Sequence, residues 1–162
     1  MLRLEKGLTP PPGARTPSLR SARRAGGTGL TLVKHEDRLE ITTEADVVTA
    51  RQKGRALAAA IGFSPAERAM ITSAISELAR NILDYAWSGE MLLGPCADGE
   101  RRGIELIARD HGPGIPNVEK VMQAGYAISD NGLPAVRALM DEFNIASVFG
   151  QGTTVTTRKW RT

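Results

Sequence analysis

The chain has 162 residues, 41% of them hydrophobic and 24% charged, which is enough for one compact domain but not for two. Residues 1–30 carry six basic residues and one acidic residue, a net charge of +5. Residues 31–162 carry 15 basic and 17 acidic residues, a net charge of −2. This larger part of the chain therefore lacks the basic charge that is typical of a nucleic-acid-binding domain. One cysteine and two histidines exclude an internal disulfide and argue against a transition-metal site, while no apolar run approaches the roughly 18 residues that span a bilayer.

Residues 1–30 form a segment of distinct composition, with four of the nine prolines and several scattered arginines. Such a segment buries too little apolar area to offset its ordering entropy, so we predict a disordered basic tail before a folded domain at residues 31–162. An alternative role is electrostatic tethering to an acidic partner. The segment lacks the apolar stretch of a secretory signal, and we expect a cytoplasmic protein.

Two short alternating runs, at residues 30–32 and 39–41, flank a polar stretch and predict a β-hairpin. Thr43 and Asp46 then match a capping box, and apolar residues recur at helical spacing until Gly62. This pattern predicts a first helix that begins after Thr43 and ends at the glycine.

The second helix has the strongest start signal in the sequence. Ser64 is a good N-cap, Pro65 suits the first helical position and Glu67 can complete a capping box. The apolar pattern continues to about Tyr85, which predicts a helix of about six turns.

The remainder of the chain alternates between short strands, glycine-rich loops and two further helices. We predict strands at 91–93 and 104–109, a loop at 110–116, a short helix at 117–123, a helix that carries Val136, Leu139, Met140 and Phe143, and final strands at 144–149 and 153–160. This order favours an α+β fold, a two-layer sandwich in which helices cover one face of an antiparallel or mixed sheet.

Glu77 and Asn81 lie one turn apart on the second predicted helix, at the edge of its apolar stripe. An amide oxygen is a hard ligand of the kind that Mg²⁺ accepts, and a carboxylate can take a proton from an attacking hydroxyl. The alternative is an ordinary helix whose Glu77 and Asn81 are solvated or bond each other.

Asp110, Gly112 and Gly114 directly follow a predicted buried strand. A carboxylate at that strand end could accept a hydrogen bond from an exocyclic amine such as that of adenine, and glycines allow the backbone to approach a flat ligand. The motif alone is a weak signal, and a tight surface turn explains it as well.

Two further glycine motifs follow. Gly132, Leu133 and a proline open a predicted helix, whose N-terminal amides could hold a phosphate, and Gly125 precedes them. Gly152 and Thr153 belong to the stretch G-Q-G-T-T, which by itself is typical of a hairpin turn.

Taken together in this order, the four motifs resemble the boxes of the GHKL ATPase superfamily. The stretches are E-L-A-R-N at 77–81, D-H-G-P-G-I at 110–115, G-L-P at 132–134 and G-Q-G-T-T at 150–154. More narrowly, the sequence resembles the RsbT-type serine kinases of bacterial partner switches over about residues 38–161. The resemblance implies a GHKL (Bergerat) sandwich with a mixed, mainly antiparallel sheet covered by helices on one face.

The resemblance also implies a role for each motif residue. Glu77 is the general base and Asn81 the Mg²⁺ ligand, while Asp110 recognises the adenine amine of ATP. The implied nucleotide-binding positions are Asp110, Gly112, Gly114, Gly125, Gly132, Leu133, Gly152 and Thr153. In the family, the γ-phosphate of ATP passes to a serine of a STAS-domain antagonist, and the kinase also binds and stimulates a PP2C-type phosphatase.

One stretch departs from the family pattern. The family's second glycine box has several glycines over the phosphates, whereas residues 128–134 read I-S-D-N-G-L-P. Fewer amides would face the phosphates, and Asp130 adds negative charge near them. Either the lid is only shorter, or the domain is a partner-switch binding module whose nucleotide chemistry has faded.

Overall fold

The computed structural model describes residues 21–25, 29–123 and 132–162, and of residues 21–25 and 29–31 it describes only the backbone. The strands are β1 (Ser21–Ala25), β2 (Gly29–Val33), β3 (Asp37–Ile41), β4 (Gly89–Asp98), β5 (Arg101–Asp110), β6 (Glu142–Val148) and β7 (Gly152–Trp160). The helices are α1 (Glu44–Ile61), α2 (Pro65–Ala86), α3 (Val118–Met122) and α4 (Gly132–Leu139). No helix in these described ranges is long and apolar enough to cross a membrane.

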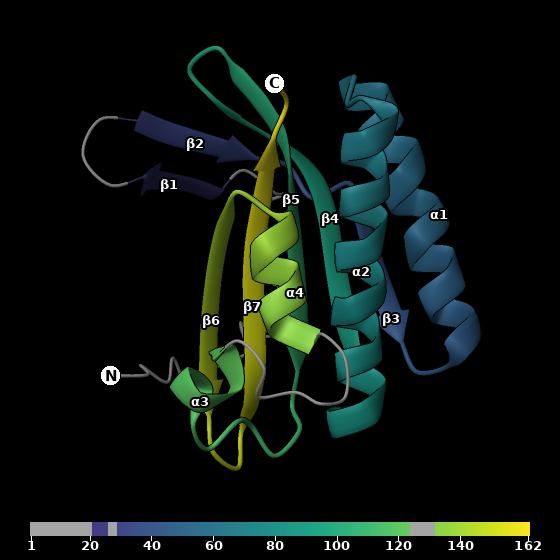
Figure 1. Cartoon of the computed structure of the whole chain (residues 1–162), viewed down its shortest axis with the longest axis vertical. Coiled ribbons are helices and arrows are strands. Elements are labelled where there is room, and N and C mark those ends of the chain that lie inside the picture. The colour runs from purple at the N-terminus through teal and green to yellow at the C-terminus, as the bar shows by residue number, and fades with distance from the viewer. Residues whose placement is uncertain (1–20, 26–28, 124–131) are drawn as a thin grey trace, which may run out of the picture.

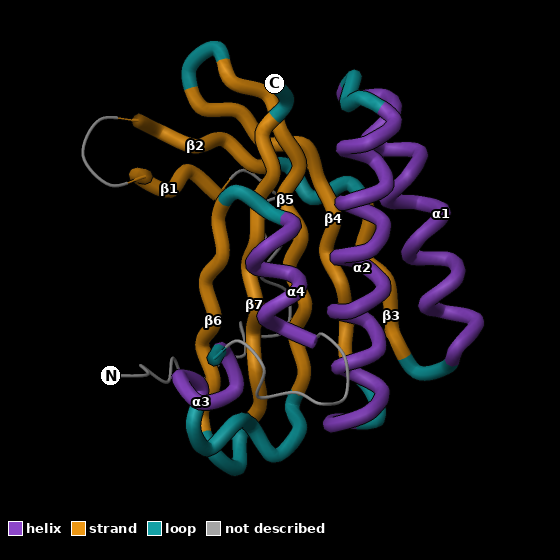
Figure 2. Tube along the Cα trace, viewed as in Figure 1, coloured by secondary structure: helices purple, strands orange, loops and turns teal. Residues whose placement is uncertain are grey.

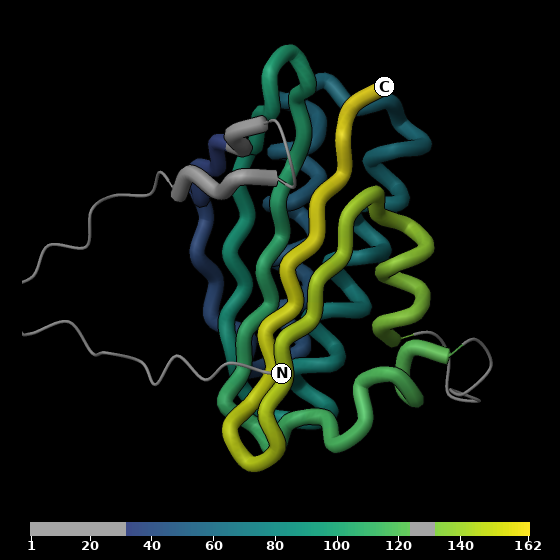
Figure 3. Tube along the Cα trace, turned by 90° about the vertical axis from the view of Figure 1, so that its left-hand side faces the viewer, coloured from purple at the N-terminus to yellow at the C-terminus, as the bar shows by residue number. Residues whose placement is uncertain are grey.

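The strands form one sheet in the order β1-β2-β4-β5-β7-β6, with β3 also paired to β4. Every described pairing is antiparallel. The helices lie on one face of this sheet, as the two views at right angles show (Figures 1 and 3). The predicted two-layer α+β sandwich is therefore confirmed.

The core fills the space between the helices and the sheet. The apolar stripe of α2 is almost fully buried there, against inward-facing residues of β4 and β5. Alternate residues of each strand point to opposite faces, so Leu106 faces the helices while Glu105 faces the other way. This packing fixes α2 across the sheet and so positions its polar edge.

Both long helices begin at the N-cap residues that the sequence predicts. Thr43 and Asp46 form a complete capping box, and Gly62, with φ of 98°, ends α1 in the left-handed region. Ser64 caps α2 and exchanges bonds with Glu67. Glu67 also accepts a hydrogen bond from the hydroxyl of Thr162 at 2.7 Å, which ties the end of the chain to the start of α2.

The bonds to Glu67 make the stability of the fold depend on pH. The backbone N–H of Ser64, followed by the Thr162 hydroxyl, lowers the pKa of Glu67 from 4.5 to about 2. Because the folded-state pKa is lowered, this stabilisation is complete above pH 4.5 and is lost as the pH falls toward 2. Glu67→Gln should cost about 1 kcal/mol of unfolding free energy at neutral pH.

Urea unfolding of both proteins between pH 2 and 7 measures this effect, and the difference between them should shrink below pH 4.5. Glu40→Gln is the control, because Glu40 is exposed on β3 and its side chain makes no hydrogen bond or ion pair with a described residue. A difference that stays constant down to pH 2 would contradict the assignment.

The predicted hairpin between residues 30–32 and 39–41 is wrong. Both β2 and β3 pair antiparallel with β4, so they run in the same direction along one edge of it. Gly94 of β4 makes this possible, because a β-carbon there would lie 1.8 Å from the carbonyl oxygen of Lys34, where the chain passes between the two strands. The hairpin that forms instead joins β1 to β2.

Two further boundaries differ from the predictions. Residues 21–25 and 29–30, expected within a disordered tail, are in strands, because backbone pairing continues from β4 through β2 to β1. Residues 1–20 and 26–28 lie outside the described ranges. The last helix ends at Leu139, and Phe143 lies in β6 because Asp141 already bonds the backbone of β7, its N–H donating to the Arg158 carbonyl at 2.9 Å.

A buried polar network lies on the sheet face opposite the helices. Glu105, 2% exposed, accepts from His35 at 2.8 Å and from Arg158 at 2.6 Å, and Arg158 also donates to Glu142 at 3.1 Å. Burial opposes ionisation of Glu105, but the bonds from His35 and Arg158 outweigh it and hold the pKa of Glu105 below its usual value. The network therefore keeps a buried carboxylate charged and paired.

Candidate functional site

Helix α2 holds Glu77 and Asn81 one turn apart, both half-buried. Neither side chain makes a hydrogen bond or an ion pair with another residue in the described ranges. The alternative in which the two side chains bond each other therefore does not hold in this structure. A carboxylate and an amide are left available one turn apart at the edge of the core.

Strand β5 ends in Asp110, and its carboxylate organises the residues around it. Its Oδ1 accepts hydrogen bonds from the backbone N–H of Gly112 at 2.9 Å and of Thr153 at 3.2 Å. No described residue bonds its Oδ2. Asp110 is half-buried, so Oδ2 is the oxygen that a ligand could reach.

Two glycines allow this arrangement because any side chain would collide with backbone. A β-carbon on Gly152, where φ is 125°, would lie 2.1 Å from the carbonyl oxygen of Asp110. On Gly114, where φ is 74°, it would lie 2.3 Å from the carbonyl oxygen of Val148. The loop after β5 is thus pressed against the β6–β7 turn, and the N–H of Gly150 donates to the carbonyl of Pro113.

The same loop also packs on the end of α2. A β-carbon on Gly112 would lie 2.6 Å from Cβ of Ala86, the last residue of that helix. The start of α4 approaches α2 one turn earlier, where a β-carbon on Gly132 would lie 3.7 Å from Oδ1 of Asn81. Helix α2 is therefore the element against which both glycine motifs lie.

The segments that carry most of the predicted site residues lie toward one end of the molecule (Figure 1). The end of α2, the loop after β5, the start of α4 and the β6–β7 turn all lie toward the lower end in Figure 1, and Figure 2 shows the loops there in teal. Leu133 is 3% exposed, with its side chain in the core, so only its backbone is available to a ligand. Gly125 lies outside the described ranges.

Sequence reasoning missed Ser147, which is fully buried on β6. Its Oγ accepts from the N–H of Ile115 at 2.7 Å, donates to the carbonyl of Gly152 at 3.3 Å, and lies 2.9 Å from Oγ1 of Thr153. One hydroxyl thus joins the loop after β5 to the start of β7. A small polar residue at an inward-facing strand position was the signal, but its partner in the loop after β5, Ile115, is 32 residues away in the chain.

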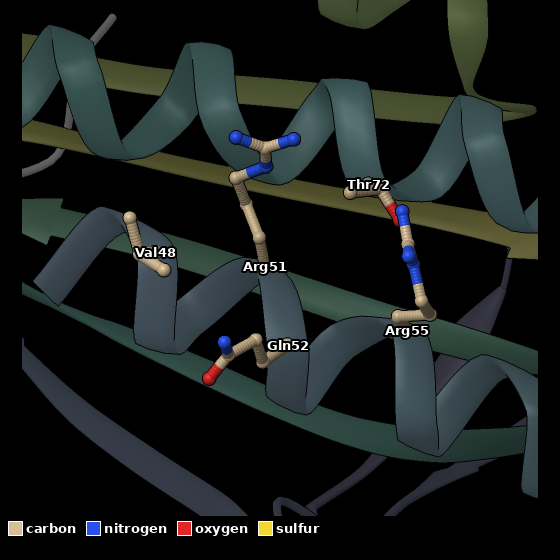
Figure 4. Close-up of a pocket in the computed structure, with 5 residues that line it drawn as sticks. All are labelled: Val48, Arg51, Gln52, Arg55 and Thr72. Carbon is tan, nitrogen blue, oxygen red and sulfur yellow. The ribbon is translucent and has the colours of Figure 1, made fainter. Parts of the chain in front are cut away.

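A separate groove lies between α1 and α2. It has a volume of about 210 Å³ and is lined by Val48, Arg51, Gln52, Arg55 and Thr72. Figure 4 shows Arg51 and Arg55 extending from α1 toward α2. None of the predicted site residues lines this groove, so it is distinct from the candidate site.

Comparison with known proteins identifies the family. A family model described as a histidine kinase-like ATPase domain matches residues 39–159. The chain belongs to this family. The histidine kinase-like ATPase assignment agrees with the sandwich fold and with the resemblance carried by the four motifs.

Two curated relatives place the chain more narrowly within the histidine kinase-like ATPases. A Bacillus subtilis protein named serine/threonine-protein kinase RsbT is 48% identical over 125 residues, which cover 75% of this chain and 94% of the relative. A protein of Anoxybacillus flavithermus named anti-sigma F factor is 32% identical over 95 residues, which cover 52% of this chain and 64% of that relative. The resemblance to the RsbT-type kinases is therefore confirmed.

Proposed function

We propose that this protein is a serine/threonine protein kinase of a bacterial partner switch, which transfers the γ-phosphate of ATP to a serine of a STAS-domain antagonist. The observation that supports this most directly is the convergence of Asp110, Thr153 and the β5–α3 loop beside the end of α2. The similarity to a protein named serine/threonine-protein kinase RsbT supports the reaction type.

The residues around Asp110 fit the base of ATP. Oδ2 is available to accept from the adenine amine, while Oδ1 is held by two backbone N–H groups that fix the orientation of the carboxylate. The close contact of Gly152 with the Asp110 backbone leaves no side chain between β7 and this position. In the proposal, Asp110 selects the base, and Gly112, Gly114 and Gly152 allow the backbone to approach it.

The residues of α2 fit the phosphates and the metal. Asn81 offers an amide oxygen near the start of α4, where backbone N–H groups and the helix dipole favour negative charge. Bound ATP with Mg²⁺ would supply the phosphoryl group and neutralise its charge. Asn81 would hold the metal, and the carboxylate of Glu77, one turn away, would accept the proton of the attacking serine.

The partners in the proposal follow from the family. The two relatives carry the names of a kinase and of an anti-sigma factor, which are functions exercised through other proteins. We therefore propose a STAS-domain antagonist as phosphate acceptor and a PP2C-type phosphatase as a second partner. Because the reaction consumes ATP, the proposal keeps the cytoplasmic setting expected from the sequence.

Radiolabelled ATP tests the transfer directly. Incubation of the full chain with ATP, Mg²⁺ and a STAS-domain protein should label that protein on serine, and replacement of the acceptor serine by alanine should abolish the label. EDTA should stop the reaction, because the metal neutralises the phosphates during transfer. Absence of transfer to every STAS-domain protein tested would count against the proposed kinase activity.

A further inference from the structure

Ser147 lies next to the part of the candidate site that is proposed to bind the adenine base. The chemistry of its partners assigns a donor and an acceptor to each of its hydrogen bonds. A serine hydroxyl has one proton to donate and two lone pairs that accept. The N–H of Ile115 can only donate, so it takes one lone pair at 2.7 Å. The carbonyl of Gly152 can only accept, so it receives the Ser147 proton at 3.3 Å.

This assignment fixes the role of Thr153. Its Oγ1 lies 2.9 Å from Oγ of Ser147, and the remaining group on Ser147 is one lone pair. We assign the Ser147 proton to the Gly152 carbonyl, and in this arrangement the Thr153 hydroxyl donates to Ser147, which is one of the two directions that the 2.9 Å contact allows. All three contacts are then satisfied at once, as a fully buried hydroxyl requires.

Two hydrogen-bond acceptors, the Thr153 hydroxyl and the Asp110 carboxylate, therefore face the candidate site. With its proton given to Ser147, the half-buried Thr153 hydroxyl can only accept from a ligand. The carboxylate of Asp110 accepts the Thr153 N–H at 3.2 Å and offers its other oxygen as a second acceptor. The exocyclic amine of adenine donates to such acceptors, whereas the carbonyl oxygen at the same position of guanine does not.

We infer that Ser147 is a positioning residue that makes the site prefer adenine to guanine nucleotides, by holding the Thr153 hydroxyl as a hydrogen-bond acceptor. The inference rests on the proposed function, since it requires the base to lie at Asp110. Without the Ser147 hydroxyl, the Thr153 proton is free to turn toward the ligand. The site could then donate to the guanine carbonyl, and its preference would fall.

Calorimetric titration with ATP and with GTP, each with Mg²⁺, tests this inference. The measured quantity is the ratio of the two dissociation constants. Ser147→Ala should lower the preference for ATP about tenfold, the equivalent of one hydrogen bond. Ser147→Cys, which nearly keeps the side-chain volume, should lower it in the same direction and guards against a folding defect in the alanine variant.

Two other variants separate this role from simple support of the fold. Thr157 is fully buried on β7, the strand that also carries Thr153, and donates to the carbonyl of Glu142 at 2.6 Å, so Thr157→Val is a matched loss of a buried hydroxyl away from the site. It should lower stability and leave the nucleotide ratio within about twofold of wild type. In a Thr153→Val background, Ser147→Ala should change the ratio by less than about twofold, because the hydroxyl that it controls is gone.

An unchanged ratio in Ser147→Ala, or an equal drop with and without the Thr153 hydroxyl, would overturn the inference. A merely structural role would weaken ATP and GTP alike and so would give the unchanged ratio. The wild-type titration keeps the two proposals apart. If wild type binds neither nucleotide, the proposed function fails, and if it binds ATP while Ser147→Ala keeps the ratio, only the inference about Ser147 fails.

Discussion

Replacement of Glu77 by glutamine should lower the rate of phosphate transfer to the STAS-domain acceptor by about 10²–10⁴-fold, the usual contribution of a general base. The dissociation constant of ATP should stay within about twofold of wild type, because the amide keeps the shape of the side chain and Asp110 and Asn81 are unchanged. The Glu77 side chain makes no hydrogen bond or ion pair with a described residue, so the substitution breaks none in the described fold.

Single-turnover transfer from radiolabelled ATP gives the rate, and calorimetry gives the affinity. Glu100→Gln is the control, because Glu100 lies exposed in the β4–β5 turn, at the opposite end of the molecule from the candidate site (Figure 1). A Glu77→Gln rate within about fivefold of wild type would exclude this carboxylate as the base.

The largest expected effect on stability comes from Arg158. Arg158→Met should lower the free energy of unfolding by about 3–5 kcal/mol, because it removes the guanidinium that pairs with the buried carboxylate of Glu105 at 2.6 Å. Glu105 is 2% exposed and accepts from Arg158 at 2.6 Å, so water cannot replace the lost cation. The double variant Glu105→Leu, Arg158→Met should recover much of the loss, since it removes the buried charge as well.

Urea unfolding at neutral pH measures these differences. Arg38→Met is a matched control, since Arg38 pairs with Glu90 at 2.7 Å with a side chain that is 73% exposed. Exposed pairs of this kind contribute about 1 kcal/mol or less. If Arg158→Met lowered the free energy of unfolding no more than Arg38→Met, the polar network on the sheet face opposite the helices would not contribute to stability as described.

The helix starts could be predicted because their chemistry is local. The capping box of Thr43 and the N-cap at Ser64 involve residues three apart in the chain, and both form as expected. The strand pairing near the start could not be predicted in the same way. Alternation identifies a strand but not its partner, and the partner of both β2 and β3 depends on Gly94, about 60 residues downstream of them.

The same difference between local and distant partners applies to the candidate site. Asp110 and the glycines around it stand out in sequence because each motif is short, and the structure brings Asp110 together with Thr153. Ser147 and the network at Glu105 did not stand out. His35 and Glu105 are 70 residues apart in the chain, and only the register of the sheet brings them within 2.8 Å.

Calorimetric titration of the full chain with ATP, with and without Mg²⁺, tests the central claim most directly. We predict micromolar, Mg²⁺-dependent binding that Asp110→Asn weakens by about 10–100-fold, because an amide has one acceptor oxygen in place of the two that hold the backbone N–H groups and accept from the adenine amine. The double variant Arg51→Gln, Arg55→Gln, in the α1–α2 groove that shares no residue with the candidate site, should bind ATP as wild type does. Absence of binding at millimolar ATP to the folded protein, or equal binding by Asp110→Asn, would contradict the account and leave a partner-switch module with a shortened lid.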